Sequence, residues 1–308
     1  MKRTACIFIT LLLAAALPLA AQKHERLVKQ RFQTPADPEV TVDVRFGDVT
    51  VTQSEDNAVD AMVRVAVSKG SKEDAKRLAE SVTVDLRQEG NRVLVRAGLP
   101  KKQGGMDNSN LEINVTVSVP SRARLLCETK FGDVRASGVQ GRVKVVSSFG
   151  DVEVTRCSNV EVYSSYGEVS VGDIGGSMRL KSSMGGIKAF SVPGGRIESS
   201  YGDLNVTRPA GPVEITSSMG EITVKECRGG AIKNAYGDVD ITLSSAFSGT
   251  VEAETSFGDI DGDVDFDDLG KKNKYGPTAE KKRATMGSGN DRLQINSSFG
   301  DITVERAR

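Results

Sequence analysis

Short runs of alternating apolar and polar residues recur at a nearly fixed interval between residues 131 and 304. Each run surrounds a large apolar residue, which is followed by Gly, usually by an acid, and then by a β-branched or aliphatic residue. The copies start at Phe131, Phe149, Tyr166, Met184, Tyr201, Met219, Tyr236, Phe257 and Phe299, with an isolated earlier copy at Phe46. By subtraction, the starts from 131 to 236 lie 18, 17, 18, 17, 18 and 17 residues apart. Such a period predicts a solenoid whose repeats bury their apolar faces against one another.

Each repeat is expected to contain two short strands. We number positions from the large apolar residue, which is position 0. Apolar residues occupy positions −6, −4, +3 and +5, as Val143, Val145, Val152 and Val154 do around Phe149. Both pairs alternate with period two, and the Gly-acid pair between them is typical of a turn. A second turn follows at about +8 to +11. The pattern predicts an all-β fold: a single-stranded parallel β-helix, or β-solenoid, of 17–18-residue coils stacked about 4.8 Å apart.

The orientation of position 0 stays open in the sequence. Strict alternation from −6 and −4 places it inside, and a buried column is the first expectation. The phase must nevertheless break at the Gly, because +3 and +5 also point inward. An outward ladder of Phe, Tyr and Met would be a contiguous apolar patch and hence a partner surface. The candidate binding ladder consists of Phe131, Phe149, Tyr166, Met184, Tyr201, Met219, Tyr236 and Phe257.

Two polar columns accompany position 0. Serine pairs such as Ser147-Ser148 and Ser164-Ser165 precede it. One hydroxyl of each pair is expected inside, where it would hydrogen-bond along the stack. Acids at +2 form a column of like charge, which we interpret as a solvated turn rather than a cation site. The acids are Asp133, Asp151, Glu168, Asp203, Glu221, Asp238 and Asp259.

Residues 1–21 have the features of a secretory signal peptide. Lys2 and Arg3 precede an apolar core and small residues at Ala20-Ala21, after which cleavage is expected. The core is too short for a membrane span. Export to the periplasm or the cell surface of a bacterium is therefore predicted, without membrane insertion of the mature chain.

Residues 22–120 are interpreted as a β-rich N-terminal cap. Residues 22–37 are expected to be a polar tail in which His24 is solvated, and the first strand is expected from Glu39. A helix is predicted near residues 72–82, with Ser71 as its cap and Ala75, Leu78 and Ala79 on its apolar face. The solenoid would then occupy residues 121–308.

An irregular excursion is expected at 261–290, where an acidic segment is followed by basic ones. Counted from Asp261, Phe266 and Lys272 stand where a calcium-binding EF-hand loop needs Gly and Glu. The segment is therefore interpreted as a protruding loop between coils.

The positions of the cysteines argue against a disulfide, and the net charge argues against nucleic-acid binding. Cys127 occupies a −4 position, so it is expected to be a buried thiol. Cys157 and Cys227 both occupy +8 but lie four repeats apart, about 19 Å, which is beyond disulfide reach.

Without Lys2 and Arg3 the chain has 41 − 2 = 39 basic and 41 acidic residues. A net charge of −2 gives no electrostatic footprint for nucleic acid.

The phrase Ser-Ser-(Phe/Tyr)-Gly-Asp-(Val/Ile)-x-Val, with a β-rich cap and a signal peptide, resembles the bacterial DUF4097 family of β-helical proteins labelled as adhesins. The resemblance covers residues 39–308 and implies a right-handed β-helix with no catalytic motif to transfer. We therefore assign no catalytic, cofactor-binding or metal-binding residue and expect no cofactor.

The expected function is a secreted cell-envelope β-solenoid, an adhesin-like binding or scaffold protein without catalysis, whose partner is a protein or a glycan. The alternative is a periplasmic partner in envelope signalling or assembly. A polysaccharide-lyase type of enzyme is disfavoured, because the coil is short and no pair of carboxylates stands apart from the repeat.

Overall fold

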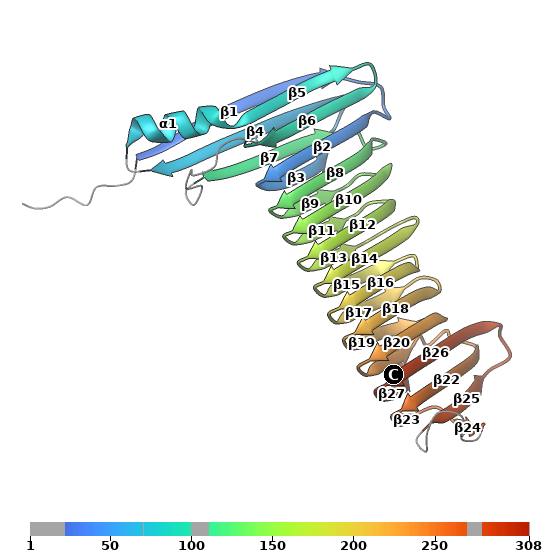
Figure 1. Ribbon diagram of the computed structural model, residues 1–308. Helices are drawn as coiled ribbons and strands as arrows, with labels where there is room; N and C mark the ends of the chain where they lie inside the picture. The colour runs from blue at the N-terminus through green and yellow to red at the C-terminus, as the bar shows by residue number, and fades with distance from the viewer. Residues whose placement is uncertain (1–21, 70, 100–110, 270–278, 308) are drawn as a thin grey trace, which may run out of the picture.

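Two long sheets dominate the computed structural model, which describes residues 22–69, 71–99, 111–269 and 279–307. The described residues form 27 strands and one helix, so the predicted all-β fold is confirmed. Coils stack along one axis from the N-terminal cap to the C-terminal end (Figure 1). The predicted signal peptide lies outside the described residues. Within them, no helix has the length and hydrophobicity that crossing a membrane requires.

Each sheet is a stack of strands contributed by successive coils. The 14-stranded sheet contains, in spatial order, β24 (Asp267–Asp268), β25 (Glu280–Met286), β22 (Gly249–Phe257), β26 (Asp291–Phe299), β20 (Gly230–Tyr236), β18 (Val213–Met219), β16 (Gly195–Tyr201), β14 (Met178–Met184), β12 (Asn159–Tyr166), β10 (Arg142–Phe149), β8 (Arg124–Phe131), β2 (Glu39–Phe46), β6 (Arg92–Gly98) and β5 (Thr83–Glu89). The 13-stranded sheet contains β1 (Gln22–Gln33), β4 (Ala58–Lys69), β7 (Leu111–Val119), β3 (Asp48–Gln53), β9 (Val134–Ser137), β11 (Val152–Thr155), β13 (Val169–Gly172), β15 (Ile187–Val192), β17 (Leu204–Pro209), β19 (Ile222–Cys227), β21 (Val239–Leu243), β27 (Ile302–Arg306) and β23 (Ile260–Gly262).

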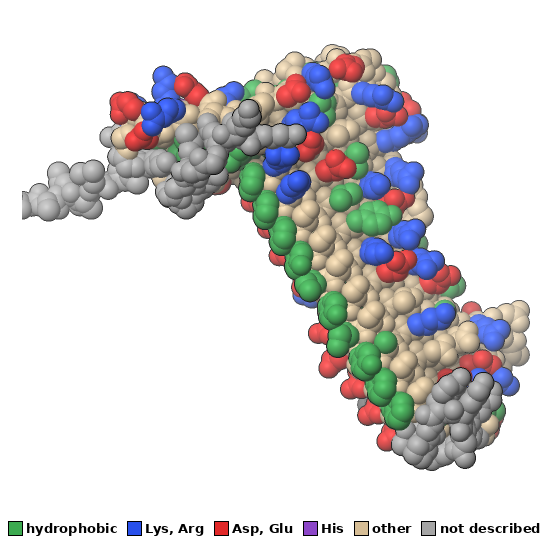
Figure 2. Space-filling model, viewed as in Figure 1, with side chains coloured by type: hydrophobic (Ala, Val, Ile, Leu, Met, Phe, Trp, Pro, Cys, Tyr) green, Lys and Arg blue, Asp and Glu red, His purple; other side chains and the backbone are tan. Residues whose placement is uncertain are grey.

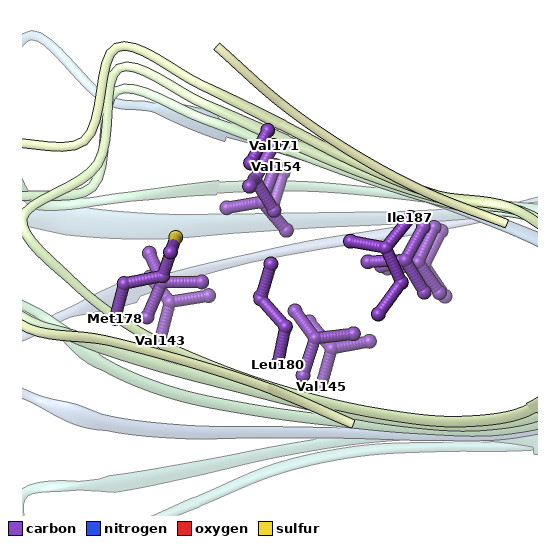
Figure 3. Close-up of a cluster of buried hydrophobic side chains, with 14 of the residues drawn as sticks. Val143, Val145, Val154, Val171, Met178, Leu180 and Ile187 are labelled. Atoms are coloured by element: carbon purple, nitrogen blue, oxygen red, sulfur yellow. The ribbon is translucent and has the colours of Figure 1, made fainter. Parts of the chain in front are cut away.

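The apolar columns predicted from the repeat form the core between the sheets. Val143 pairs in parallel with Val160, and Val160 with Met178. Side chains at −6, −4, +3 and +5 of this region are buried and stack coil upon coil, as Figure 3 shows for Val145 and Leu180 from one sheet and Ile187 from the other. Burial of like residues in register therefore holds neighbouring coils together.

The coils at both ends are stacked out of sequence order. The last coil of the chain, β26–β27, lies between the coil β20–β21 and the coil β22–β23. At the other end, β2–β3 lies between β8–β9 and β6–β7. The outermost parallel strands β6, β7 and β22 then pair antiparallel with β5, β4 and β25, whereas β23 is the last strand of its sheet. These partners cover backbone groups that an open stack would expose to edge-to-edge association.

The predicted polar tail at residues 22–37 is wrong. Residues 22–33 form β1, which pairs antiparallel with β4 along twelve residues. Phe32 is buried, and Arg26 donates to the carbonyl groups of Ala79 and Val82 at the end of the helix α1 (Lys72–Ser81). Polar residues on the other face of β1 hide its strand character in the sequence.

The predicted helix and its cap are confirmed. Ser71 accepts a hydrogen bond from the backbone N–H of Asp74, and Ala75, Leu78 and Ala79 are the buried residues.

Part of the expected excursion at 261–290 forms a strand. Lys281 and Arg283 of β25 pair with Glu254 and Glu252 of β22, because the two strands run antiparallel in the sheet.

Glycine at +1 forms a corner that no other residue fits. Gly167 has φ +117°, and a Cβ built on it would lie 2.2 Å from the carbonyl oxygen of Gly150 in the preceding coil. Its N–H donates to the Met184 carbonyl of the following coil over 3.1 Å. Gly132, Gly150, Gly185, Gly202, Gly220, Gly237, Gly258 and Gly300 have the same positive φ and a built Cβ within 2.1–2.6 Å of a neighbouring carbonyl.

Aspartate at +2 links one coil to the next. The Oδ1 atom of Asp151 accepts the backbone N–H of Glu168 over 2.8 Å, and the N–H of Asp151 donates to Oδ1 of Asp133 over 3.0 Å. Equivalent bonds join Asp48 to Asp133, Asp203 to Glu221, Asp238 to Asp301 and Asp301 to Asp259. The acid column is therefore a structural part of the corner as well as a charged surface.

The inward polar residues at −2 do not form the expected hydroxyl ladder. They are buried, but among the described residues no hydrogen bond joins one to the next along the stack. Where a bond occurs, it goes to a corner glycine: Ser182 donates to the Gly185 carbonyl over 3.2 Å, and Thr255 to the Gly300 carbonyl. The −2 side chains therefore bond, where they bond at all, to the corner backbone and not to one another.

The three cysteines of the described chain are free, as predicted, and all three are buried, as predicted for Cys127. Burial raises the pKa of the Cys127 thiol to about 12, and burial raises that of Cys227 to about 11. Burial also raises the pKa of Cys157, against hydrogen bonds from the backbone. Thiolate, the nucleophilic form, is therefore scarce at neutral pH.

Gly167→Ala is expected to lower the free energy of unfolding by at least about 2 kcal/mol, because Ala disfavours this φ and its Cβ meets the Gly150 carbonyl. Gly172→Ala is the matched control. Its Cβ would have no neighbour closer than 3.8 Å, so a change within about 0.5 kcal/mol is expected. Urea unfolding of both variants measures the difference, and equal losses would contradict the corner argument.

Asp151→Ala is expected to cost about 1 kcal/mol, because the Glu168 amide loses its acceptor. Asp151→Asn keeps an oxygen at Oδ1 and should retain most of that stability. Hydrogen exchange of the Glu168 amide reports the bond directly. Equally fast exchange in the Ala and Asn variants would show that the side chain does not protect it.

The buried thiols predict a specific alkaline sensitivity. In the unfolded chain the Cys127 thiol has its ordinary pKa of 9.0, whereas burial in the folded protein raises that pKa to about 12. Stability should therefore fall as pH rises above about 9, and the fall should be smaller in Cys127→Ala. At pH 8 a thiol reagent should label the folded protein slowly and the denatured protein at once. Fast labelling of the native state would disprove the burial.

Candidate functional site

Position 0 points outward, so the first expectation of a buried column is wrong. Phe131, Phe149 and Tyr166 are each 43–44% exposed, whereas the preceding −2 side chains Ser147 and Ser164 are buried. The sheet register explains the break in phase. It pairs Ser147 with Ser164 and Phe149 with Tyr166 but leaves the intervening serines unpaired. The chain then turns at the glycine corner, where +3 resumes the inward face.

The outward residues form one continuous stack, which we call the aromatic ladder. Each member pairs in register with the next along the 14-stranded sheet. Figure 2 shows the resulting hydrophobic stripe along one edge of the solenoid. In spatial order the ladder is Phe46, Phe131, Phe149, Tyr166, Met184, Tyr201, Met219, Tyr236, Phe299 and Phe257. The eight candidate residues are thus brought together, and Phe46 and Phe299 join them.

Neighbouring rings in the ladder lie face to face. Phe131 and Phe149 have centroids 5.0 Å apart and planes inclined by 4°, and Tyr236 and Phe299 are 4.9 Å apart at 2°. Met184 and Met219 alternate with Tyr201 in the middle of the ladder. Because stacked rings cover the faces of their neighbours, the two runs of rings present mainly ring edges to solvent, and the middle of the ladder presents Tyr201 between two Met side chains.

An acidic border follows the ladder along its length, and we call it the acid row. It comprises the +2 acids Asp48, Asp133, Asp151, Glu168, Asp203, Glu221, Asp238, Asp301 and Asp259. Figure 2 shows acidic side chains beside the hydrophobic stripe. Asp133 lies 3.4 Å from Arg135, and Glu168 lies 2.7 Å from Lys188. The other seven acids form no ion pair with any described residue.

The opposite border of the ladder is small and uncharged over its middle portion. Positions −1 are occupied there by Ser148, Ser165, Ser183, Ser200, Ser218 and Ala235. The surface therefore consists of three parallel rows: acid, aromatic or Met, and serine. This asymmetry is a property of the repeat and extends over most of the coils.

Other candidate chemistry is sparse in the part of the chain that the structure describes. His24 lies on β1, at the edge of the 13-stranded sheet, whereas the ladder residues belong to the 14-stranded sheet. No group of three or more His, Cys, Asp or Glu side chains among the described residues is arranged to hold a metal ion. The ladder is thus the surface that the geometry singles out. Sequence reasoning missed Phe46 and Phe299 as members, although both start copies of the repeat.

Comparison with known proteins gives low identities to solved structures. A "putative cell adhesion protein" from Clostridium sporogenes ATCC 15579 is 11% identical, with 92% of this chain and 100% of that chain covered and a TM-score of 0.25. A "putative adhesin" from Parabacteroides distasonis ATCC 8503 is 12% identical, with 92% and 97% covered and a TM-score of 0.36. A "putative lipid binding protein" from the same organism is 10% identical, with the same coverage and a TM-score of 0.27.

No curated protein matches the chain. A family model described as Toastrack DUF4097 matches residues 38–305, from the start of the parallel stack to its last coil. This match includes every residue of the aromatic ladder and of the acid row, and it agrees with the family resemblance noted in the repeat. The chain therefore belongs to the Toastrack DUF4097 family.

Proposed function

We propose that this protein is an exported β-solenoid of the bacterial cell envelope that binds a macromolecular partner without catalysis. The observation that carries the proposal is the aromatic ladder, in which ten large side chains are 40–51% exposed in one unbroken line. Soluble proteins rarely expose contiguous apolar surface of this kind unless it contacts a partner. The N-terminal signal features of the sequence support export to the periplasm or the cell surface.

The shape of the ladder favours an extended partner surface. Ten rungs at about 4.8 Å per step make a line about 43 Å long and one side chain wide. Small-molecule sites are usually concave and enclose most of their ligand. A straight ridge of this length is better suited to a polymer or to a protein surface. The glycine corners hold it rigid, so little conformational entropy is lost on binding.

A non-catalytic role agrees with the state of the reactive side chains. The three thiols are buried, and burial raises their pKa values well above neutrality. The structural contacts of the acid row are made with backbone amides of the corner. These features favour a scaffold with a binding edge.

The double variant Tyr166→Ser, Tyr201→Ser is expected to detach the protein from its envelope partner without unfolding it. Each substitution removes a stacked rung and should cost about 1 kcal/mol, compared with about 3–5 kcal/mol for a core aromatic residue. Wild-type and variant proteins are expressed with their own signal, and thermal unfolding is measured alongside retention in washed envelopes. Tyr163→Ser, on the outer face of the 14-stranded sheet, is the matched control.

Protease accessibility on intact and permeabilised cells decides between surface and periplasm. Cleavage on intact cells supports the adhesin-like role, whereas protection until permeabilisation supports a periplasmic partner. Retention of the variant equal to that of wild type would show that the ladder is not the binding surface. Protection in both states, with no cleavable signal, would contradict export.

A further inference from the structure

We infer that the partner of the ladder is a basic amphipathic α-helix of another protein, which lays its apolar face along the ladder and its Lys and Arg side chains along the acid row. This inference rests on the proposed function and adds the chemical class of the partner. It is carried by the unpaired charge of the acid row, the geometry of the stacked rings and the one-sided arrangement of the three rows.

The acid row has charge that the fold does not neutralise. Among the described residues, most acids on the outer face of the solenoid coils in the 14-stranded sheet are paired, whereas Glu128 is not: Glu161 pairs with Arg142, Glu198 with Lys181 and two arginines, and Glu252 with Arg283 and Arg292. In contrast, seven of the nine acids in the row have no basic partner among the described residues. Adjacent carboxylates one coil apart repel by about 1 kcal/mol even in water. A cationic partner would relieve this repulsion.

The structural role of Asp does not account for the whole row. Glu221 follows Asp203 and donates its backbone N–H to that carboxylate, but its own carboxylate accepts no hydrogen bond from a described residue. Asp259 is the last rung, and its carboxylate likewise accepts none there. Carboxylates are therefore present at rungs where they accept no hydrogen bond from the backbone of the corner. A charge-dependent contact explains these positions.

Stacking determines which chemistry the ladder can bind. A sugar ring or a cation binds an aromatic residue over its face, but within the two runs of stacked rings, Phe46 to Tyr166 and Tyr236 to Phe257, the facing ring surfaces cover one another at 4.7–5.0 Å. Ring edges and Met side chains pack well against aliphatic groups. This geometry favours Leu-like side chains over a glycan, and so a protein partner.

The parallel rows favour a helix over an extended strand. A strand sends successive side chains to opposite faces, so an apolar face and a basic face would point in opposite directions. A helix presents an apolar stripe with a basic stripe beside it on the same side. At 1.5 Å per residue, a helix of about 29 residues would span the ladder. The serine row leaves the opposite border free of charge, so the basic residues are needed on only one flank.

The test uses the full mature protein and fluorescein-labelled synthetic peptides of about 29 residues. One peptide has Leu on one helical face and Lys beside it, a second replaces each Lys with Glu, and a third scrambles the first. Fluorescence anisotropy measures binding at about 50 mM and about 300 mM salt. Three triple variants are compared with wild type, after circular dichroism and thermal unfolding confirm that each is folded.

The first variant neutralises the acid row with Asp203→Asn, Glu221→Gln and Asp238→Asn, which keeps the Oδ1 acceptors of the corner. The second removes rungs with Tyr201→Ser, Met219→Ser and Tyr236→Ser. The matched control neutralises three acids on the outer face of the 14-stranded sheet, with Glu161→Gln, Glu214→Gln and Glu254→Gln. We expect the Leu–Lys peptide to bind the wild-type protein. Its affinity should fall at least tenfold for each of the first two variants, and at least tenfold for wild type at the higher salt concentration. For the control variant its affinity should fall less than twofold.

Three results would overturn the inference. These are no binding of the Leu–Lys peptide, equal binding of the scrambled or Glu peptide, or equal loss in the charge control and the acid-row variant. Sedimentation that shows ladder-dependent self-association without peptide binding would identify a second copy as the occupant instead. If envelope retention depends on the ladder while no peptide binds, the proposed function stands and only the class of partner is wrong.

Discussion

The close approach of glycine backbones at the corner is the constraint on which the structure depends. Each corner glycine lies so near the carbonyl group of the preceding coil that a built Cβ would be 2.1–2.6 Å from its oxygen. Except at Gly258 in the last coil of the stack, the same glycine donates its N–H to the position-0 carbonyl of the following coil, over 2.8–3.2 Å along the stack. Together these contacts fix the rise between coils and the direction of the chain as it leaves the corner. Position 0 therefore has the same orientation in every coil, and ring stacking follows from backbone geometry.

The repeat and its strands could be predicted from the sequence because the patterns that mark them are local. Alternation at Val143, Val145, Val152 and Val154 identifies strands whichever coil they pack against, and Ser71 identifies the start of α1. The outward turn of Phe149 could not be read in this way. It depends on an unpaired Ser148 and on the positive φ of Gly150, and both break the alternation on which a strand pattern relies. The family resemblance predicted the β-helix but not the direction of this column.

Non-local pairing explains the remaining differences. The sequence of β1 resembles a polar tail because one buried residue, Phe32, lies among charged ones, and its partner β4 is more than twenty residues away. Insertion of β26 between β20 and β22 leaves each strand pattern unchanged, so no sequence period records it. The consequence for the candidate site is direct. Phe299 bridges Tyr236 and Phe257, with ring contacts of 4.9 and 4.7 Å, and keeps the ladder continuous.

The acid row connects the stability of the coil with the chemistry of its edge. Asp is the residue whose carboxylate reaches the amide of the next coil, so the corner itself supplies a line of negative charge beside the aromatic line. That charge hydrates an apolar ridge that would otherwise promote association, and it opposes the contact of two ladders whose acid rows meet. The same field attracts a basic surface. The partner that we infer carries both apolar and cationic side chains, because either property alone would satisfy only one of the two rows.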